Sequence, residues 1–364
     1  MNPLRGQNNV QGANDAGATP VYYPGYQKVV DDSVREIFES AWGVPLSPNN
    51  GINLNEMMKE MARGNVKAVY VMGEDIVISE PNVTKVEAGL NACEFVVCQE
   101  IFHNETTRFA DVVLPGACFA EKDGVFTNSD RRVQRVRKAV DPPGDACPDW
   151  QILCAVARAS AYDMPDYPSS KEVFAEFASL TPQLRGMSYE RLETNVKGLH
   201  WPCPNEDHPG TPTLHLDGPI IGVAPFQAVD YRPSDELPDN EYPLVLSTGR
   251  TLYHYNSATQ TRRDAGPVAK QRGNFIEIHR RDAKILGIAN GDRVEVSSRR
   301  GTIAAEAWIS PRVRFGCIWM PMHFAESRAN LLTNDAGDAV TGTGEYKVCA
   351  VKVRKAKQAT EALV

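Results

Sequence analysis

Two hydrophobic periods alternate over the first 150 residues. Residues 53–63 carry apolar side chains at positions 54, 57, 58 and 61, which is the spacing of one helix face, and Asn53 can cap the first turn. The β-branched run 66–72 ends in Gly73-Glu74-Asp75, which predicts a strand followed by a tight turn. The alternation continues in three further segments, a helix over 84–91 and strands over 94–99 and 110–115. Apolar strands that alternate with helices predict a mostly parallel sheet.

The pattern changes twice after residue 150. Helical spacing over 150–161 and 171–179 is followed by the Pro-rich stretch 201–212, and we interpret 151–215 as a bridging segment. From about residue 216 the period becomes two. Residues 292–308 alternate around Arg300-Gly301, which indicates a hairpin. Further short strands are predicted over 244–249, 275–278, 316–320 and 347–353, with a short helix over 282–288. This spacing favours a small β-barrel.

Three domain segments are therefore expected, an α/β parallel-sheet domain over 1–150, the bridging segment 151–215 and an all-β small barrel over 216–364.

Composition and charge exclude some classes of binding partner. A formal charge of −7 argues against nucleic acid or an anionic membrane as the main partner. No apolar run reaches the roughly 18 residues that a membrane-spanning helix needs.

The eight cysteines are too sparse for a disulfide scaffold, and none forms a C-x-x-C pair. Cys98 lies in the apolar run 94–99 and is predicted to be a buried strand residue. A metal or cluster role for any of the cysteines is disfavoured. Together these features predict a reducing compartment and a cytoplasmic protein.

Candidate chemistry gathers at predicted strand ends, where ligands bind in open α/β sheets. Gly73 would let backbone N–H groups approach a ligand, and Glu74 or Asp75 could accept hydrogen bonds from a purine or pterin edge. The alternative is a turn glycine beside solvated carboxylates. In the barrel, Arg250, His254 and nearby hydroxyls could bind phosphates and ring edges, although a histidine beside aromatic residues is as often packed in a core.

The first residues carry another candidate. Arg5 and Gln7 are separated by a glycine, so a sharp turn could direct both side chains to one point. A guanidinium binds a small carboxylate in a two-pronged geometry, and a carboxamide can complete its orientation. The alternative is an ordinary loop rich in Gly and Asn. The sequence has no His, Asp and Glu set at metal-ligand spacing, no Walker loop and no Gly-x-Ser-x-Gly elbow.

Taken in order, several segments resemble the C-terminal half of the molybdopterin oxidoreductase family, and within it the soluble or NAD-linked formate dehydrogenase catalytic subunits. The resemblance is strongest in 2–12, 109–115, 124–134, 242–250, and 330–333 with 345–347. It implies that the barrel is double-psi-like, that Arg5 binds or orients formate and that Gln7 lines the same pocket. It also implies a cofactor of two molybdopterin guanine dinucleotides holding molybdenum or tungsten.

The resemblance assigns cofactor contacts to residues in both parts of the chain. In the α/β part these are Met72, Gly73, Glu74, Gln99 and Asp149. In the barrel they are Gly249, Arg250, His254, Tyr255, Asn330, Tyr346 and Lys347. The implied reaction oxidises formate to CO2, and the electrons leave through iron–sulfur centres to an NAD-reducing or hydrogenase-type partner. The protein would supply orientation and electrostatics, while metal and pterin do the chemistry.

Family members also carry an N-terminal cysteine cluster for a [4Fe-4S] centre and a cysteine or selenocysteine that ligates the metal, and neither is in this sequence. The chain is therefore expected to be a fragment, a split subunit or a truncated reading frame that shares its cofactor with an absent N-terminal half and has no activity alone. Residues 118–148 would return toward the absent cluster domain, and 119–134 would expose an apolar surface. Two alternatives stay open, a related enzyme for another small oxyanion and a non-catalytic cofactor-binding half of a split enzyme.

Overall fold

Two compact units make up the chain in a computed structural model that describes residues 5–216, 218, 222–223, 225–271, 273–338 and 341–356. One unit comprises Met1–Asn53 and Pro115–Val229, and the other comprises Leu54–Leu114 and Asp230–Val364. The α/β residues 54–114 thus form one unit with the barrel, and the units cut across the boundaries expected at 150 and 215. Those domain boundaries stay a prediction.

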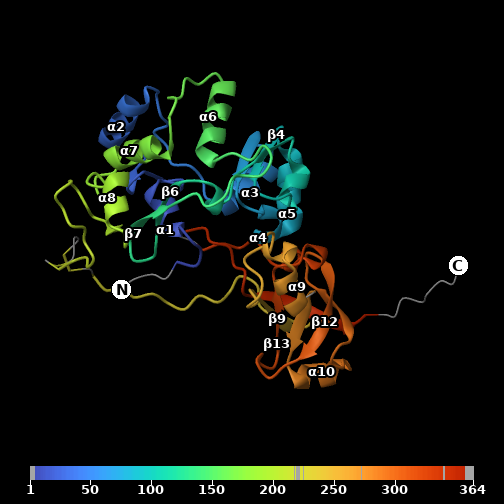
Figure 1. Ribbon diagram of the computed structural model, residues 1–364. Coiled ribbons are helices and arrows are strands. Elements are labelled where there is room, and N and C mark those ends of the chain that lie inside the picture. The colour runs from blue at the N-terminus through green and yellow to red at the C-terminus, as the bar shows by residue number, and fades with distance from the viewer. Residues whose placement is uncertain are drawn as a thin grey trace. The chain divides into compact units, whose positions relative to one another are not determined.

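A three-stranded sheet opens the second unit. Its strands are β3 (Ala68–Met72), β4 (Phe95–Glu100) and β5 (Val112–Pro115), in that order. Strands β3 and β4 are parallel, with Met72 opposite Gln99, which confirms the predicted parallel arrangement. Helices α3 (Leu54–Ala62) and α5 (Val83–Ala92) pack together beside the sheet (Figure 1). The core between them buries Met58, Met61, Val71, Val86, Val96 and Cys98, so Cys98 is buried as predicted.

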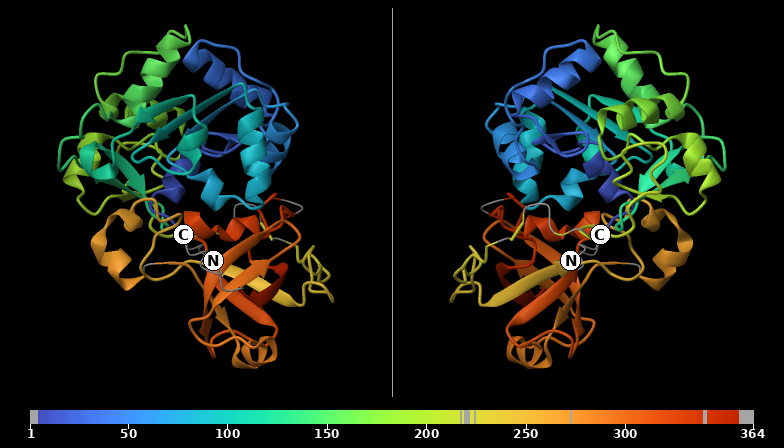
Figure 2. Two further views of the ribbon diagram at one scale, coloured as in Figure 1. Left: turned by 90° about the vertical axis from the view of Figure 1, so that its right-hand side faces the viewer. Right: turned by 90° about the vertical axis from the view of Figure 1, so that its left-hand side faces the viewer.

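Six strands of the same unit close into a barrel. They are β9 (Leu244–Gly249), β10 (Phe275–Ile278), β11 (Arg293–Ser297), β12 (Thr302–Ile309), β13 (Cys317–Pro321) and β14 (Cys349–Lys355). The order around the barrel is β10-β12-β11-β14-β9-β13. Figure 2 shows these strands, in yellow, orange and red, curling around one axis. The barrel predicted from the sequence is confirmed.

Alternation of side chains explains why these strands close on themselves. Buried and more exposed residues alternate over 293–296 of β11 and 302–308 of β12, with Val294 and Val296 buried on one strand and Ile303 and Ala305 on the other. Side chains that alternate across a strand supply one continuous apolar interior. The predicted hairpin is confirmed, because Ser297 lies opposite Thr302 in the antiparallel β11–β12 pair.

Short helices connect these strands. In the sheet part they are α4 (Ile76–Ser79) and the 3-10 helix η1 (Thr106–Phe109), and in the barrel part α9 (Ala265–Lys270), α10 (Arg280–Leu286), η3 (Thr261–Arg263), η4 (Ala325–Ser327) and η5 (Ala329–Leu331). Helix α10 lies at one end of the barrel (Figure 1). Helix α10 ends at Gly287, which adopts a left-handed φ of 64° at the C-terminal end of the helix.

The first unit has its own core. Its elements are α1 (Val10–Asp15), β1 (Tyr22–Tyr23), β2 (Gln27–Lys28), α2 (Asp32–Trp42), η2 (Phe119–Glu121), β6 (Gly124–Thr127), β7 (Arg132–Val136), α6 (Asp149–Ala159), α7 (Ser170–Leu180), α8 (Tyr189–Thr194) and β8 (Leu199–His200). Strands β6, β7 and β8 form an antiparallel sheet. Val133 of β7 is buried with Phe174, Leu192 and Leu199. Phe119, at the start of the stretch expected to be apolar and exposed, is largely exposed.

None of the helices in the described part of the chain is both long and apolar enough to cross a membrane.

Candidate functional site

The turn after β3 is held against the end of β4. Gly73 adopts a φ of 65°, a left-handed conformation that favours glycine, and its N–H donates to the carbonyl of Gln99 at 2.9 Å. The side chain of Gln99 is buried, and the Tyr70 hydroxyl donates to its Oε1 at 2.5 Å. Met72 is exposed at the strand end. The turn is therefore fixed in position at the carboxyl edge of the sheet, where ligands bind in this class of fold.

Replacing Gly73 tests this turn. An added Cβ would meet no atom within 4 Å, so the cost of Gly73→Ala is backbone strain alone. We expect Gly73→Ala to lower the free energy of unfolding by about 1–2 kcal/mol. Gly73→Asn should recover part of this loss, because asparagine tolerates the left-handed region better than alanine. Urea denaturation of the three proteins measures both effects, and an alanine variant as stable as the parent would contradict the left-handed turn.

Two carboxyl groups follow this turn, and one of them, that of Glu80, is buried. Glu80, at the end of α4, is 6% exposed, and burial, together with the negative charge of Glu74, raises its pKa to about 7. Glu74 is exposed at the surface, but partial desolvation of its carboxylate by the surrounding protein raises its pKa, and it accepts a hydrogen bond from the Ser79 hydroxyl at 3.3 Å. The Tyr346 hydroxyl hydrogen-bonds to the Glu80 carboxyl. The strand-end turn and the Tyr346 segment of the barrel part are thus in direct contact.

Asn330 makes a second connection between these two parts. Its Nδ2 donates to the carbonyls of Val77 at 2.8 Å and Glu80 at 2.6 Å. Its Oδ1 is buried and has no hydrogen-bond partner in the part of the chain that the structure describes. An unsatisfied buried acceptor is uncommon in folded proteins, and it offers a ligand a place to donate.

Two cations lie on the barrel side of this site. Lys347 Nζ donates to the carbonyl of Thr248 at 2.6 Å, and the Thr248 hydroxyl donates to the carbonyl of Tyr346 at 2.7 Å. Burial and then the positive charge of Arg250 lower the pKa of Lys347. Arg250 Nε donates to Asn256 Oδ1 at 2.8 Å. Two cations held near one another favour a ligand with an anionic group such as a phosphate.

Gly249 precedes Arg250 and has a steric reason to be glycine. An added Cβ would lie 2.7 Å from Nε1 of Trp319, closer than real side chains approach. The strand end and the tryptophan on β13 can pack together only because position 249 has no side chain.

His254 is engaged inside the protein. It is buried, its Nε2 lies 3.0 Å from the carbonyl of Gln271, and its Nδ1 lies 3.2 Å from the Thr261 hydroxyl. A carbonyl only accepts, so Nε2 carries the hydrogen and Nδ1 accepts from Thr261. Tyr255 is half-exposed, and its backbone N–H also donates to the Thr261 hydroxyl, at 3.2 Å. The cofactor contact assigned to His254 stays a prediction.

Sequence reasoning missed His323, which is buried beside His254. The backbone N–H of Thr251 donates to Nε2 of His323 at 2.9 Å, and Nδ1 hydrogen-bonds to the carbonyl of Asn256. Burial lowers the pKa of His323 to about 4, so the ring is neutral at pH 7. The His323 imidazole thus holds both ends of the segment 251–256 that follows Arg250. In the sequence, His323 is marked by its position just after the apolar strand predicted over 316–320.

Three predicted site residues lie in the other compact unit. Arg5 is exposed. Burial raises the pKa of Asp15, and the positive charge of Arg5 is among the interactions that oppose this rise. Gln7 is half-buried, and Asp149 begins α6 and forms an ion pair with Lys122. The structure therefore brings together the Gly73 turn, Glu74, Arg250, Asn330, Tyr346 and Lys347 within one unit. The roles assigned to Arg5, Gln7 and Asp149 stay predictions.

The described residues contain no group of three or more His, Cys, Asp or Glu side chains arranged to hold a metal ion. The chemistry of the site is instead that of an anion and heterocycle site, with carboxyls on one side and cations on the other.

Comparisons with known proteins agree with this chemistry. The family model for molybdopterin oxidoreductase matches residues 2–159, and the model for the molybdopterin dinucleotide binding domain matches residues 244–350. The second match covers Gly249, Arg250, His254, Tyr255, Asn330, Tyr346 and Lys347.

Similar proteins cover nearly all of this chain. F420-dependent formate dehydrogenase subunit alpha of Methanocaldococcus jannaschii is 48% identical over 98% of this chain and 52% of its own length. Formate dehydrogenase H of Escherichia coli is 39% identical over 97% of this chain and 50% of its own length. The assimilatory nitrate reductase catalytic subunit of Bacillus subtilis is 33% identical over 96% of this chain and 51% of its own length. The chain spans about half the length of these relatives.

A solved structure extends the likeness to the fold. Acetylene hydratase from Pelobacter acetylenicus aligns with a TM-score of 0.65 over 90% of this chain and 50% of that chain, at 16% identity. Both family models match in chain order, and the curated relatives align along almost the whole sequence. This chain belongs to the molybdopterin oxidoreductase family.

Proposed function

We propose that this chain is the C-terminal part of the catalytic subunit of a molybdenum or tungsten formate dehydrogenase. The observation that carries the proposal is the identity of 48% and 39%, over nearly the whole chain, to two proteins named formate dehydrogenases. In this proposal an N-terminal half supplies the metal ligand and the [4Fe-4S] centre. Electrons would leave through iron–sulfur centres to an NAD-reducing or hydrogenase-type partner.

The described residues fit a molybdopterin guanine dinucleotide. Arg250 and Lys347 would bind phosphate oxygens, because both are cationic and close together. Glu74 would accept hydrogen bonds from the N–H edge of a guanine or pterin ring. The unpartnered Oδ1 of Asn330 would accept one more. When bound, the metal–pterin group would accept the two electrons, or the hydride, that formate loses.

The substrate contacts would come from the first residues. The Arg5 guanidinium would hold the formate carboxylate through two parallel N–H···O bonds, and the Gln7 carboxamide would complete its orientation. Formate would leave as CO2 with release of one proton and two electrons.

Reconstitution tests this function. This chain should be co-expressed with an N-terminal half that carries the cysteine cluster and the metal-ligating cysteine or selenocysteine. The complex should contain molybdenum or tungsten with about two guanine nucleotides per metal ion, and should reduce a viologen dye with formate. This chain alone should oxidise no formate. A complex that loads metal and guanine but oxidises no formate would contradict the substrate and leave the cofactor site standing.

A second candidate function is the turnover of another small oxyanion, favoured by the 33% identity to a nitrate reductase. The same complex distinguishes the two. Oxidation of reduced viologen by nitrate, with no reaction on formate, would establish the second candidate.

A further inference from the structure

A cationic surface lies at one end of the barrel, on α10 and on the loop 310–316 between β12 and β13 (Figure 1). Four of its side chains are exposed cations, and no carboxylate of a described residue lies within ion-pair distance of any of them. They are Arg280, Arg281, Lys284 and Arg314. Two large apolar side chains of the same segments are also exposed, Ile285 by 72% and Phe315 by 54%. We call these six residues the α10 surface.

The loop is held against the helix. The N–H of Gly316 donates to Oδ2 of Asp282 at 2.9 Å. The guanidinium carbon of Arg281 lies 5.6 Å from the centroid of the Phe315 ring. Ile285 follows Arg281 by one helical turn and therefore lies on the same side of α10. The cations and the apolar side chains thus form one surface whose two segments are fixed relative to each other.

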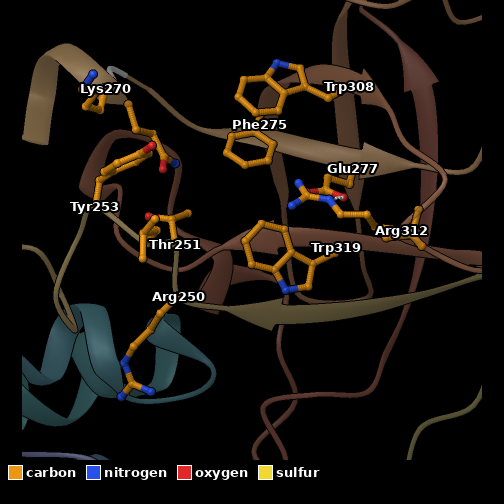
Figure 3. A pocket seen from close by; sticks show the side chains of 12 residues that line it. Arg250, Thr251, Tyr253, Lys270, Phe275, Glu277, Trp308, Arg312 and Trp319 are labelled. Carbon is orange, nitrogen blue, oxygen red and sulfur yellow. Dashed lines mark hydrogen bonds and ion pairs between the residues drawn. The ribbon is translucent and has the colours of Figure 1, made fainter.

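Two carboxylates close to α10 in the sequence are already engaged. Asp282 is 5% exposed, and it points inward to the Gly316 N–H. Glu277 is buried and forms an ion pair with Arg312 of the loop, so that this pair is neutral (Figure 3). Four cations against the one carboxylate of Asp282 leave the α10 surface positive, in a chain whose formal net charge is −7.

The stability of α10 does not explain these cations. Arg280 and Arg281 occupy the first turn, where the partial positive charge of the free backbone N–H groups disfavours a cation. Arg280 and Lys284 are four positions apart, and like charges at this spacing also destabilise a helix. Exposed side chains that cost the fold stability and combine charge with apolar area are typical of a binding surface.

A short acidic segment with an apolar side chain is complementary to this surface. Its carboxylates would pair with the cations, and its apolar side chain would remove Phe315 and Ile285 from water. The seven residues of α10 rise by about 10 Å, which an extended segment of about four residues covers. Nucleic acid and anionic membranes extend far beyond such a patch, and the negative charge of the rest of the chain repels them.

A second copy of this chain offers no such segment in its acidic stretch 235–241. Glu236 and Asp239 of this stretch form ion pairs with Arg299, and Glu241 forms one with Lys352. These carboxylates are already neutralised within their own chain. The acidic segment must therefore come from a different protein.

We propose that the α10 surface binds a short acidic segment of a partner protein. Carboxylates of the segment pair with Arg281, Lys284 and the neighbouring cations, and an apolar side chain of the segment packs against Phe315 and Ile285. The proposal rests on the barrel alone and does not depend on the formate dehydrogenase assignment.

Fluorescence anisotropy of a labelled peptide with the sequence EEDFEELE tests the proposal on the full chain. The peptide should bind with a Kd below about 100 μM at about 50 mM salt, and about fivefold more weakly at about 300 mM salt, because salt screens the ion pairs. A second peptide, with serine in place of its two apolar residues, should bind about fivefold more weakly than the first. A third peptide, KKKFKKLK, should not bind.

Two variants separate the charged contacts from the apolar ones. Arg281→Glu combined with Lys284→Glu should raise the Kd of the first peptide at least about tenfold. Phe315→Ser should raise it about fivefold, and should leave the Kd of the serine peptide unchanged. Arg185→Glu combined with Lys197→Glu is the matched control, since it changes the net charge equally at exposed cations of the other compact unit. The control should stay within about twofold of the parent, and far-UV circular dichroism should show that each variant is folded.

Several results would overturn the proposal. The first is no binding of the EEDFEELE peptide up to about 1 mM, and the second is an equal loss of binding in the control variant. A DNA duplex or phosphatidylserine vesicles that bind more tightly than the peptide, and only when Arg281 and Lys284 are intact, would assign the surface to a polyanion. A dimer in sedimentation velocity that the Arg281 and Lys284 variant does not form would assign it to a second copy of this chain.

Discussion

Replacing Arg5 with lysine in the reconstituted enzyme should lower kcat/KM for formate about 100-fold. Lysine keeps the positive charge but offers a point charge in place of the planar fork that matches both carboxylate oxygens. The metal and guanine content should not change, because Arg5 is exposed and no residue of the proposed cofactor contacts is altered. Steady-state kinetics with a viologen acceptor, together with metal analysis, measures both quantities.

A second arginine provides the control. Arg158 is exposed on α6, in the same compact unit as Arg5. Its guanidinium Nη1 lies 3.8 Å from Oδ1 of Asp166. Exposed ion pairs of this kind contribute little, so Arg158→Lys should leave both kcat/KM and metal content within about twofold of the parent. A parent-like kcat/KM in Arg5→Lys would remove the formate role from Arg5. A loss of equal size in both variants would point to damaged folding.

Local pattern was sufficient to predict the elements around the site. The helical spacing of 53–63 and the β-branched run 66–72 correspond to α3 and β3. The period of two over 292–308 correctly predicted the β11–β12 hairpin. These signals depend on neighbouring residues, and each element buries the face that its spacing defines. The parallel pairing of β10 with β12 and of β9 with β13 carries no such local signal, because it depends on how distant strands close the barrel.

The site itself was predictable only in part. Gly73 and Glu74 follow from the rule for strand ends, whereas Asn330, Tyr346 and Lys347 rested on the family resemblance. Glu80 was not predicted, because a carboxylate before Pro81 looks like a solvated turn residue. Its burial comes from residues about 250 positions away, since Asn330 caps its backbone carbonyl. Long-range packing of this kind determines the burial of Glu80 and so the pKa of its carboxyl, and the residues around position 80 in the sequence do not indicate it.

Glu80 provides the second large expected effect. Its folded-state pKa of about 7 is higher than the ordinary value of 4.5, because burial and the charge of Glu74 disfavour the carboxylate. The fold therefore binds the Glu80 proton more tightly than the unfolded chain does. The resulting stability is fully present below pH 4.5 and is lost as the pH rises through 7. A difference of this size corresponds to about 3 kcal/mol.

Replacing Glu80 with glutamine should remove this pH dependence. Near pH 5 we expect Glu80→Gln and the parent to have similar free energies of unfolding, and near pH 8 we expect the variant to be more stable by about 2–3 kcal/mol. Urea denaturation at both pH values measures how the difference in free energy of unfolding between parent and variant changes with pH. Other buried carboxyls titrate alike in both proteins, so their contributions cancel.

In a Tyr346→Phe background the Glu80 carboxylate loses a hydrogen bond that lowers its pKa. The stability difference near pH 8 between the proteins with and without the Glu80→Gln change should therefore grow. Asp141 serves as the control, because its hydrogen bond to Lys138 lowers its pKa and places its titration below this pH window. If Glu80→Gln shows no more gain between pH 5 and 8 than Asp141→Asn, the Glu80 carboxyl is already ionised in the folded protein at pH 5.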